Sequence, residues 1–292
     1  MITAHRLAFA AGLASCLAAL PALAQEPKFF FETAPAFEAC GDNSLARVQK
    51  DGITLGFSQN PPEAMLDEKT KQASGIDWDV NKGVLDWLGV KTIKTEWMPW
   101  ESQVPALNSK RTDVIAGNIH VNPERVKVIS FTGPAYWYGP VILVAKGNPL
   151  GIKSYDDLKG KKVGSISGSA ADFYLRKIGV TTTPFKTAID ELQSLNQGRL
   201  QAILEDDLVY LEFAKTNTKH NIQPLWTIAA PDEIINGGGY GMARFALRKE
   251  DCTLRVAYTH ALSEMRANGM MSHILKKYGL SDRNLSMYKL NP

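Results

Sequence analysis

The sequence has little net charge and no long block of charges of one sign. Its 33 lysines and arginines stand against 30 aspartates and glutamates, which leaves +3. A surface that binds nucleic acid needs a concentrated basic patch, so we expect no nucleic-acid partner. The chain has 292 residues, 45% hydrophobic and 22% charged. That composition is typical of a globular protein with one large domain or two smaller ones.

Motifs for catalysis and for cofactors are missing as well. We find no ligand spacing typical of a metal site, no serine or cysteine nucleophile motif and no phosphate-binding loop. An internal repeat and a low-complexity tract are also absent from the sequence. The sequence therefore predicts no catalytic residue, no metal and no cofactor.

Only the N-terminus is apolar over a long stretch. A basic start, Met1–Arg6, precedes the alanine-rich segment 7–23, and Ala22-Leu23-Ala24 matches a signal-peptidase site. The segment is short for a transmembrane anchor and lacks a charged stop. We expect residues 1–24 to be a signal peptide that is cleaved after Ala24, so that the protein is periplasmic. A lipoprotein box at Cys16 is the less favoured alternative, because the apolar stretch continues past it.

Few cysteines are left after that cleavage. They are Cys40 and Cys252, and they would lie in a compartment where disulfides persist. Either the two form a disulfide or both are buried free thiols, and the sequence does not decide between these states.

Apolar periodicity indicates alternating strands and helices. The expected strands are 53–57, 91–97, 112–116, 141–145, 162–166, 200–204 and 245–248. The expected helices are 77–88, 100–110, 154–158, 170–177, 187–197, 254–267 and 270–278. The β-α-β-α-β order at the start favours a mostly parallel sheet, so we assign the chain to the α/β class.

Two crossings divide this pattern into two lobes. They are the aromatic segment Tyr136–Pro140 and the glycine run Gly237–Gly239. The sequence predicts a discontinuous first lobe, residues 25–137 plus 241–292, and a second lobe, residues 138–240. A cleft between two such lobes is a natural ligand site that can close by hinge motion.

One arginine, Arg125, stands where it could hold a carboxylate. It follows the expected strand 112–116 and the sequence Asn122-Pro123-Glu124, in which the asparagine caps a short helix that begins at the proline. The carboxyl ends of strands in open α/β sheets present ligand-binding groups, and a guanidinium is a two-pronged donor for a carboxylate. A solvated surface arginine is the alternative.

Three further features fit the same kind of ligand. Asp206 follows the expected strand 200–204 and could accept a hydrogen bond from an ammonium group, unless it lies in an exposed acidic loop. Ser169 and Ala170 begin a helix after a glycine turn, where free backbone N–H groups bind anions. Trp100 at a helix start could cover an apolar or cationic part of a ligand, or belong to the core. Together these features indicate a receptor for a zwitterion.

At these residues the chain resembles the family 3 periplasmic solute-binding proteins, the polar amino acid receptors of ABC importers. The resemblance covers nearly all of 51–280. The stretches that carry it are Pro61-Pro62 with Ser74–Val80, Val104–Arg125, Ser154–Gly164 and Leu247–Gly269. Residues 146–151 are similar to the ectoine-binding branch as well. The resemblance implies a two-lobed, type II (Venus-flytrap) periplasmic binding protein fold, with two crossovers and the ligand in the cleft between the lobes.

The resemblance also implies roles for single residues. Arg125 would grip the ligand α-carboxylate, and Asp206 would hold the α-ammonium. The other implied ligand contacts are Asn118, His120, Ser169, Ala170 and Trp100, with the serine and the alanine donating to the carboxylate. The implied function is amino acid transport: a monomer captures an amino acid or a related zwitterion and delivers it to an inner-membrane ABC permease.

The sequence departs from the family pattern around the ligand. Asn60 and Glu63 flank Pro61-Pro62, the first where an aromatic or acidic residue is common and the second where an aromatic is. His120 replaces a small hydroxyl or an aromatic residue. This loss of aromatic character argues against an ectoine cage. Glu63 either pairs with a cationic or hydrogen-bonding ligand side chain or points outward on a mobile loop.

Two other functions stay open. One is a periplasmic enzyme on the same fold, similar to a dehydratase, in which Glu205, Asp206 and His120 would supply acid and base groups. Turnover of a bound compound would reveal it. The other is a ligand-sensing domain. We see no signalling or anchoring segment in the sequence, which argues against this function. A fold alone does not decide among these functions.

Overall fold

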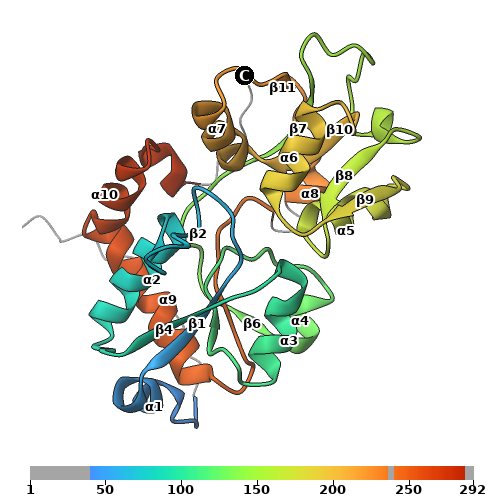
Figure 1. The fold of residues 1–292 in the computed structure, drawn as a ribbon. Coiled ribbons are helices and arrows are strands. Elements are labelled where there is room, and N and C mark those ends of the chain that lie inside the picture. The colour runs from blue at the N-terminus through green and yellow to red at the C-terminus, as the bar shows by residue number, and fades with distance from the viewer. Residues whose placement is uncertain (1–39, 236–239, 287–292) are drawn as a thin grey trace, which may run out of the picture. The chain divides into compact units, whose positions relative to one another are not determined.

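Two five-stranded sheets with helices around them form the described part of the chain (Figure 1). The structure is a computed structural model, and it describes residues 40–235 and 240–286. These residues belong to one compact unit that begins at Cys40. The two-lobed α/β fold that the sequence predicts is therefore visible as two separate sheets. In the described residues no helix is both long and apolar enough to cross a membrane.

The first sheet has the strand order β4-β1-β5-β12-β6. Its strands are β1 (Ile53–Phe57), β4 (Ile93–Trp97), β5 (Val114–Ile115), β6 (Ser130–Phe131) and β12 (Ala246–Leu247). β1 runs parallel to both β4 and β5, as expected for a β-α-β-α-β order. β12 pairs antiparallel with β5 and with β6, so a strand from late in the chain completes the first sheet.

The helices beside the first sheet pack through apolar faces. They are α1 (Ser44–Asp51), α2 (Ile76–Trp87), η2 (Trp100–Ser102), α3 (Gln103–Asn108), α4 (Arg125–Val128), α9 (Cys252–Ala267), α10 (Met270–Lys277) and η4 (Asp282–Leu285). In α2, Ile76, Val80 and Val84 are fully buried, and their spacing of four residues places them on one helical face. That face belongs to the same core cluster as residues of α9.

The second sheet has the strand order β11-β7-β10-β8-β9. Its strands are β7 (Pro140–Ala145), β8 (Val163–Ile166), β9 (Thr182–Phe185), β10 (Ala202–Asp206) and β11 (Ile222–Pro224). The helices beside it are η3 (Asp156–Leu158), α5 (Ala170–Lys177), α6 (Ala188–Asn196), α7 (Asp207–Thr216) and α8 (Asp232–Ile235). β10 is the central strand and is fully buried. A two-stranded ribbon of β2 (Met65–Leu66) and β3 (Ala73–Ser74) is separate from both sheets.

Most elements lie within a few residues of their expected bounds. The expected helix 100–110 begins with the 3₁₀ turn η2, and the expected strand 112–116 is only two residues long. Eight elements were not expected from the sequence, namely α1, β2, β3, β9, α7, β11, α8 and η4. The signal peptide, Cys16 and the glycine run of the second crossing lie outside the described residues. The lobe boundaries stay a prediction.

A disulfide joins Cys40 to Cys252 across 212 positions of the chain, so the paired state of the two alternatives is correct. Hydrogen bonds lie beside it. Asp42 accepts from the backbone N–H of Ser44 and of Thr253, each at 2.9 Å. The beginning of the described chain is thereby held against the first turn of α9.

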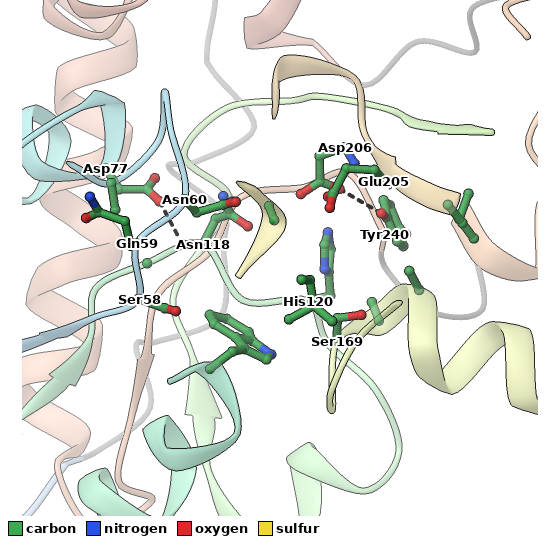
Figure 2. A pocket seen from close by; sticks show the side chains of 18 of the residues that line it. Ser58, Gln59, Asn60, Asp77, Asn118, His120, Ser169, Glu205, Asp206 and Tyr240 are labelled. Carbon is green, nitrogen blue, oxygen red and sulfur yellow. Dashed lines mark hydrogen bonds between the residues drawn. The ribbon is translucent and has the colours of Figure 1, made fainter. Parts of the chain in front are cut away.

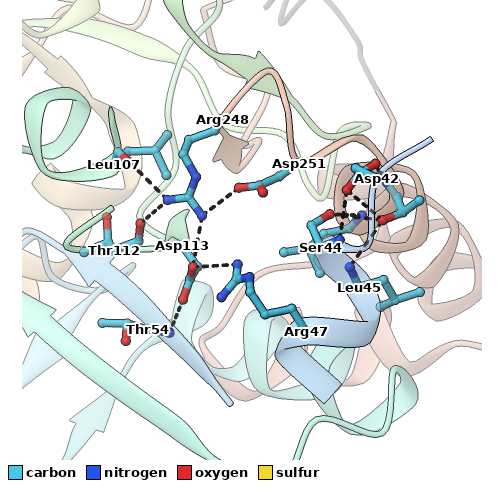
Figure 3. A network of polar contacts seen from close by, with 12 residues as sticks. Asp42, Ser44, Leu45, Arg47, Thr54, Leu107, Thr112, Asp113, Arg248 and Asp251 are labelled. Carbon is cyan, nitrogen blue, oxygen red and sulfur yellow. Dashed lines mark hydrogen bonds and ion pairs between the residues drawn. The ribbon is translucent and has the colours of Figure 1, made fainter. Parts of the chain in front are cut away.

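A second polar network centres on Arg248 (Figure 3). This side chain is 4% exposed and forms ion pairs with Asp113 at 3.0 Å and with Asp251 at 2.7 Å. It also donates to the backbone carbonyls of Leu107 and Thr112. Buried guanidinium groups are normally compensated by carboxylates in this way. Arg248 therefore serves the fold, because it ties the end of α3 and the start of β5 to the segment after β12.

Candidate functional site

A cavity lies between residues of the first-sheet elements and residues of the second-sheet elements. Its empty volume is about 690 Å³, open solvent included. Seven of the predicted site residues line it: Asn60, Trp100, Asn118, His120, Ser169, Ala170 and Asp206. Figure 2 shows Asn60 and Asn118 on one side of the cavity and Asp206 on the other. The structure therefore brings most of the predicted site together.

Carboxyl groups form one end of the cavity. Glu205 and Asp206 are the last residues of β10, and both are 7% exposed. Asp206 Oδ1 accepts from the hydroxyl of Tyr240 at 2.7 Å, and Glu205 Oε1 accepts from the backbone N–H of Asp206 at 2.8 Å. Asp206 is thus a buried strand residue, and the exposed acidic loop considered as an alternative is wrong. Burial, and next the neighbouring Glu205, raise the pKa of Asp206 well above its usual range.

Asp77 adds a third carboxyl group from the first side. It is fully buried near the start of α2 and accepts from the backbone N–H of Asn118 and from the hydroxyl of Tyr136, both at 2.8 Å. Burial raises its pKa to about 7, although these two hydrogen bonds oppose the rise. The sequence did not single out Asp77 as a site residue, because it looked like an ordinary acidic residue in the first turn of a helix.

Backbone N–H groups form another part of the lining, at the start of α5. Ser169 is the N-cap, and its Oγ accepts from the N–H of Asp172 at 3.1 Å. Ala170 and Ala171 follow and line the cavity. Among the described residues, no backbone acceptor pairs with the N–H of either alanine. The first N–H groups of a helix carry a partial positive charge, so this end of the cavity suits an anion, as the sequence predicted for Ser169 and Ala170.

Arg125 lies beside the cavity but is not one of its lining residues. It is 7% exposed, so the solvated surface arginine considered as an alternative is wrong. Its Nη1 donates to the carbonyl of His120 and its Nη2 to the carbonyl of Gly168, each at 2.8 Å. The guanidinium carbon lies 5.5 Å from the centre of the Trp100 ring. Unlike Arg248, Arg125 forms no ion pair with any carboxylate in the described part of the chain.

The cap expected for the helix of Arg125 is present in a shifted form. The Oδ1 of Asn122 accepts from the backbone N–H of Arg125 at 2.8 Å. The helix α4 begins at Arg125 and not at Pro123, as the sequence had predicted, because Pro123 and Glu124 form a turn before it. From the first residue of this helix, the Arg125 side chain reaches the carbonyl of Gly168.

His120 is a neutral hydrogen-bonding group in the cavity wall. Its Nε2 lies 2.6 Å from the hydroxyl of Tyr138, which donates to Asn118 Oδ1 at 2.7 Å. Because that hydroxyl has only one proton, His120 Nε2 is the donor of the pair, and Nδ1 is left as an acceptor. Burial, and next the charges of Arg125 and Arg244, lower the pKa of His120 to about 3. The imidazole also stacks on Tyr240, with ring centres 4.2 Å apart.

Glu63 is buried behind the cavity and is not a lining residue. It is 0% exposed, so the outward-pointing alternative is wrong. Neither carboxyl oxygen has a hydrogen-bond partner among the described residues. Burial raises its pKa well above the usual range, and the nearby Asp206 and then Asp77 raise it further. Its pairing with a ligand stays a prediction.

Several lining residues were missed at the sequence level. They are Ser58, Gln59, Ala64, Asp77, Gly117, Ile166, Ala171, Lys186, Ala188, Leu204, Glu205 and Tyr240. The sequence had suggested Glu205 only as an acid or base group of the alternative enzyme. Lys186 follows β9, a strand that the sequence did not reveal, and Tyr240 follows the glycine run of the second crossing. A signal existed for Glu205, because it stands beside the predicted Asp206.

The chain is similar in sequence to known proteins. The model of the bacterial extracellular solute-binding proteins, family 3, matches residues 53–281. The L-cystine-binding protein TcyJ of Escherichia coli (strain K12) is 33% identical over 237 residues, which cover 80% of this chain and 85% of that protein.

Solved structures give the same picture. An ancestral arginine-binding protein bound to arginine superimposes with a TM-score of 0.67 at 29% identity, covering 77% of this chain and 97% of that chain. EhuB in complex with hydroxyectoine superimposes with a TM-score of 0.73, covering 82% and 93%, but at 24% identity. The likeness to EhuB therefore concerns the fold alone.

Proposed function

The chain belongs to the bacterial extracellular solute-binding proteins of family 3, and from this premise we propose that it captures an amino acid or a related zwitterion for an inner-membrane ABC importer. We propose further that it is exported, cleaved after Ala24 and active as a periplasmic monomer. TcyJ binds L-cystine and the ancestral protein binds arginine, and both compounds are zwitterions of this kind.

The polarity of the cavity carries this proposal. Carboxyl groups of Asp206 and Glu205 form one part of the lining, and the free N–H groups at the start of α5 form another. An α-amino acid has an ammonium and a carboxylate on one carbon, so it can satisfy both parts at once. Asp206 retains an oxygen, Oδ2, that accepts no hydrogen bond from the described residues, and that oxygen is free for the ammonium.

Arg125 would hold the ligand carboxylate together with α5. It is buried without a carboxylate partner, and its Nη2 donates to the carbonyl of Gly168, two residues before Ala170. A ligand carboxylate at the start of α5 would supply the negative charge that Arg248 obtains from Asp113 and Asp251. Because groups from both sheets would contact one ligand, binding favours the arrangement in which they are close together.

A thermal-shift screen tests the proposal. Residues 25–292 are unfolded and refolded to remove any bound compound, and the melting temperature is then measured with each common amino acid, several derivatives and betaine-like zwitterions. A ligand at 100 times its dissociation constant should stabilise the protein by roughly 2.7 kcal/mol. A shift confined to compounds with a free ammonium and carboxylate is expected, and a flat screen would contradict the proposal.

The same samples separate a receptor from an enzyme. The stabilising compound is incubated with the protein for many hours and then analysed by mass spectrometry. The receptor function predicts that the compound is recovered unchanged, whereas a dehydratase-like enzyme would convert it.

A further inference from the structure

A row of aromatic rings and guanidinium groups crosses beside the cavity from the elements of the first sheet to those of the second. Its members are Trp100 of η2, Arg125 of α4, and Phe173 and Arg176 of α5. The guanidinium carbon of Arg125 lies 5.5 Å from the centre of the Trp100 ring and 5.9 Å from that of Phe173. Both distances are within the reach of a cation–π interaction. Arg125 therefore contacts one aromatic ring from each side of the cleft.

Hydrogen bonds join the two sides at the same place. The carbonyl of Gly168, in the turn before α5, accepts from Arg125 Nη2 at 2.8 Å and from Trp100 Nε1 at 3.3 Å. Asp172 braces that turn, because its Oδ2 accepts from the N–H of Gly168 at 3.1 Å. The same carboxylate pairs with Arg176 at 2.9 Å. The start of α5 thus presents a braced carbonyl and an aromatic ring to one arginine of the first side.

Phe173 is placed to act on Arg125 and not on the ligand. It is not a lining residue of the ligand cavity. It lines a separate groove, together with Arg125, Gly168 and Val128. Its side chain is 37% exposed and belongs to none of the hydrophobic core clusters of the described residues. Loss of the ring should therefore remove the contact with Arg125 and leave the core intact.

An aromatic ring is suited to hold this arginine without occupying it. A guanidinium group uses its N–H donors for carbonyl and carboxylate oxygens. The ring of Phe173 has no oxygen acceptor and attracts the cation through its face. It therefore does not compete with the carbonyls of His120 and Gly168, or with a ligand carboxylate, for the Arg125 donors.

We propose that Phe173 is a positioning residue for ligand binding, which holds the Arg125 guanidinium from the second side of the cleft and thereby slows release of the ligand. This proposal rests on the proposed function, in which Arg125 holds the ligand carboxylate. Because the two residues belong to different sides, their contact forms only when the sides are close together. Such a contact raises the closed fraction of the protein, and with it the apparent affinity.

Three variants of residues 25–292 test the proposal. Phe173→Leu keeps an apolar side chain but removes the ring, and Phe173→Tyr keeps the ring. Trp226→Leu is the matched control, because it removes another exposed aromatic ring beside the second sheet that does not line the cavity. The refolded wild type is first screened by thermal shift against the common L-amino acids and L-cystine. Stopped-flow fluorescence then measures association and dissociation rates of each compound that binds, for the wild type and all variants.

Dissociation from Phe173→Leu should be roughly 3- to 10-fold faster than from the wild type. The association rate should be unchanged, because the contact forms after the ligand has entered. Phe173→Tyr and Trp226→Leu should match the wild type in both rates.

An unaltered dissociation rate in Phe173→Leu overturns the proposal, and so does a loss confined to the association rate. An equally faster dissociation from Phe173→Tyr or from Trp226→Leu also overturns it, because the effect would not depend on the ring at this position. In each of these cases amino acid binding stands. If the wild type binds none of the compounds, the proposed function fails, and the proposal for Phe173 fails with it.

Discussion

The hydroxyl of Tyr240 donates to Asp206 Oδ1 at 2.7 Å, which links the end of β10 to the segment that follows the second crossing (Figure 2). Tyr240 also stacks on His120, so one side chain contacts both the carboxyl end of the cavity and its first-sheet wall. A contact of this kind positions the Asp206 carboxylate and stabilises its charged form, because a donor hydrogen bond favours the ion.

We expect Tyr240→Phe to weaken ligand binding by roughly 5- to 10-fold, the value of one hydrogen bond. The phenyl ring keeps the stacking on His120, so the loss should come from the hydroxyl alone. Calorimetric titrations with the ligand found in the screen provide the measurement. Tyr278→Phe is the matched control, since that hydroxyl donates to Asp79 and neither residue lines the cavity. An equal loss in both variants would contradict the role of Tyr240.

Two buried arginines should respond differently to substitution. Arg125→Ala should abolish ligand binding and lower the free energy of unfolding by only about 1–3 kcal/mol, because it loses hydrogen bonds to two carbonyls. Arg248→Ala should lower the free energy of unfolding by about 3–5 kcal/mol, because Asp113 and Asp251 lose their partner. Urea unfolding and calorimetry measure the two effects. Full-strength binding by Arg125→Ala would refute its role toward the carboxylate.

The ligand-free protein should lose stability as the pH rises from about 4 to about 7. Burial raises the pKa of Asp77 to about 7 and that of Asp207 to about 6, from the 3.8 of a solvent-exposed aspartate. A group with a raised pKa in the folded state contributes stability that is lost between its unfolded-state pKa and its folded-state pKa, by up to about 1.4 kcal/mol per pH unit for each group, and the loss ends above the folded-state value. The lowered pKa of His120 acts in the opposite direction, but only below about pH 6.5.

Urea unfolding of refolded protein at pH 4.5, 5, 5.5, 6, 6.5 and 7 measures this slope. We expect a steady decline for the wild type and a shallower one for Asp77→Asn, which removes one titrating group. A bound cation relieves the same carboxyl groups, so the stabilisation by ligand should grow over the same range. Stability that stays constant or rises from pH 4.5 to 7 would contradict the raised pKa values.

The sequence predicted a helix or strand correctly where its signals lie close together in the chain. The bounds of α5, Ala170–Lys177, agree with the expected helix, because the glycine turn, the serine cap and the apolar spacing all lie within ten residues. The edge strand β9 was missed since its sequence, Thr182–Phe185, contains a proline and has no regular apolar alternation. The helix α7 begins directly after β10, without a glycine or proline to mark the boundary.

In the candidate site, too, the sequence predicted residues with local signals and missed contacts between distant residues. Asp206 and the start of α5 were predicted because strand ends and helix starts are visible in a sequence. The contact of Tyr240 with Asp206 joins residues 34 positions apart, and the burial of Glu63 depends on how its loop packs against Asp77. Such contacts follow from tertiary packing, which apolar periodicity does not report.

Loss of the disulfide should affect stability and spare ligand binding. The double variant Cys40→Ser with Cys252→Ser removes a link that closes a loop of 212 residues, and the free energy of unfolding should fall by about 2–5 kcal/mol. Neither cysteine lines the cavity, so the dissociation constant at a temperature where the variant is folded should match the wild type. Weaker binding by the folded variant would show that the disulfide also shapes the site.

The most direct test of the account compares Asp206→Asn with the wild type. The two refolded proteins are titrated calorimetrically with the amino acid that gave the largest thermal shift. Because asparagine keeps the shape but removes the charge, we predict that the variant binds at least roughly 10-fold more weakly while its circular dichroism spectrum is unchanged. Equal affinity of Asp206→Asn and the wild type would contradict the claim that this cavity holds the ligand ammonium.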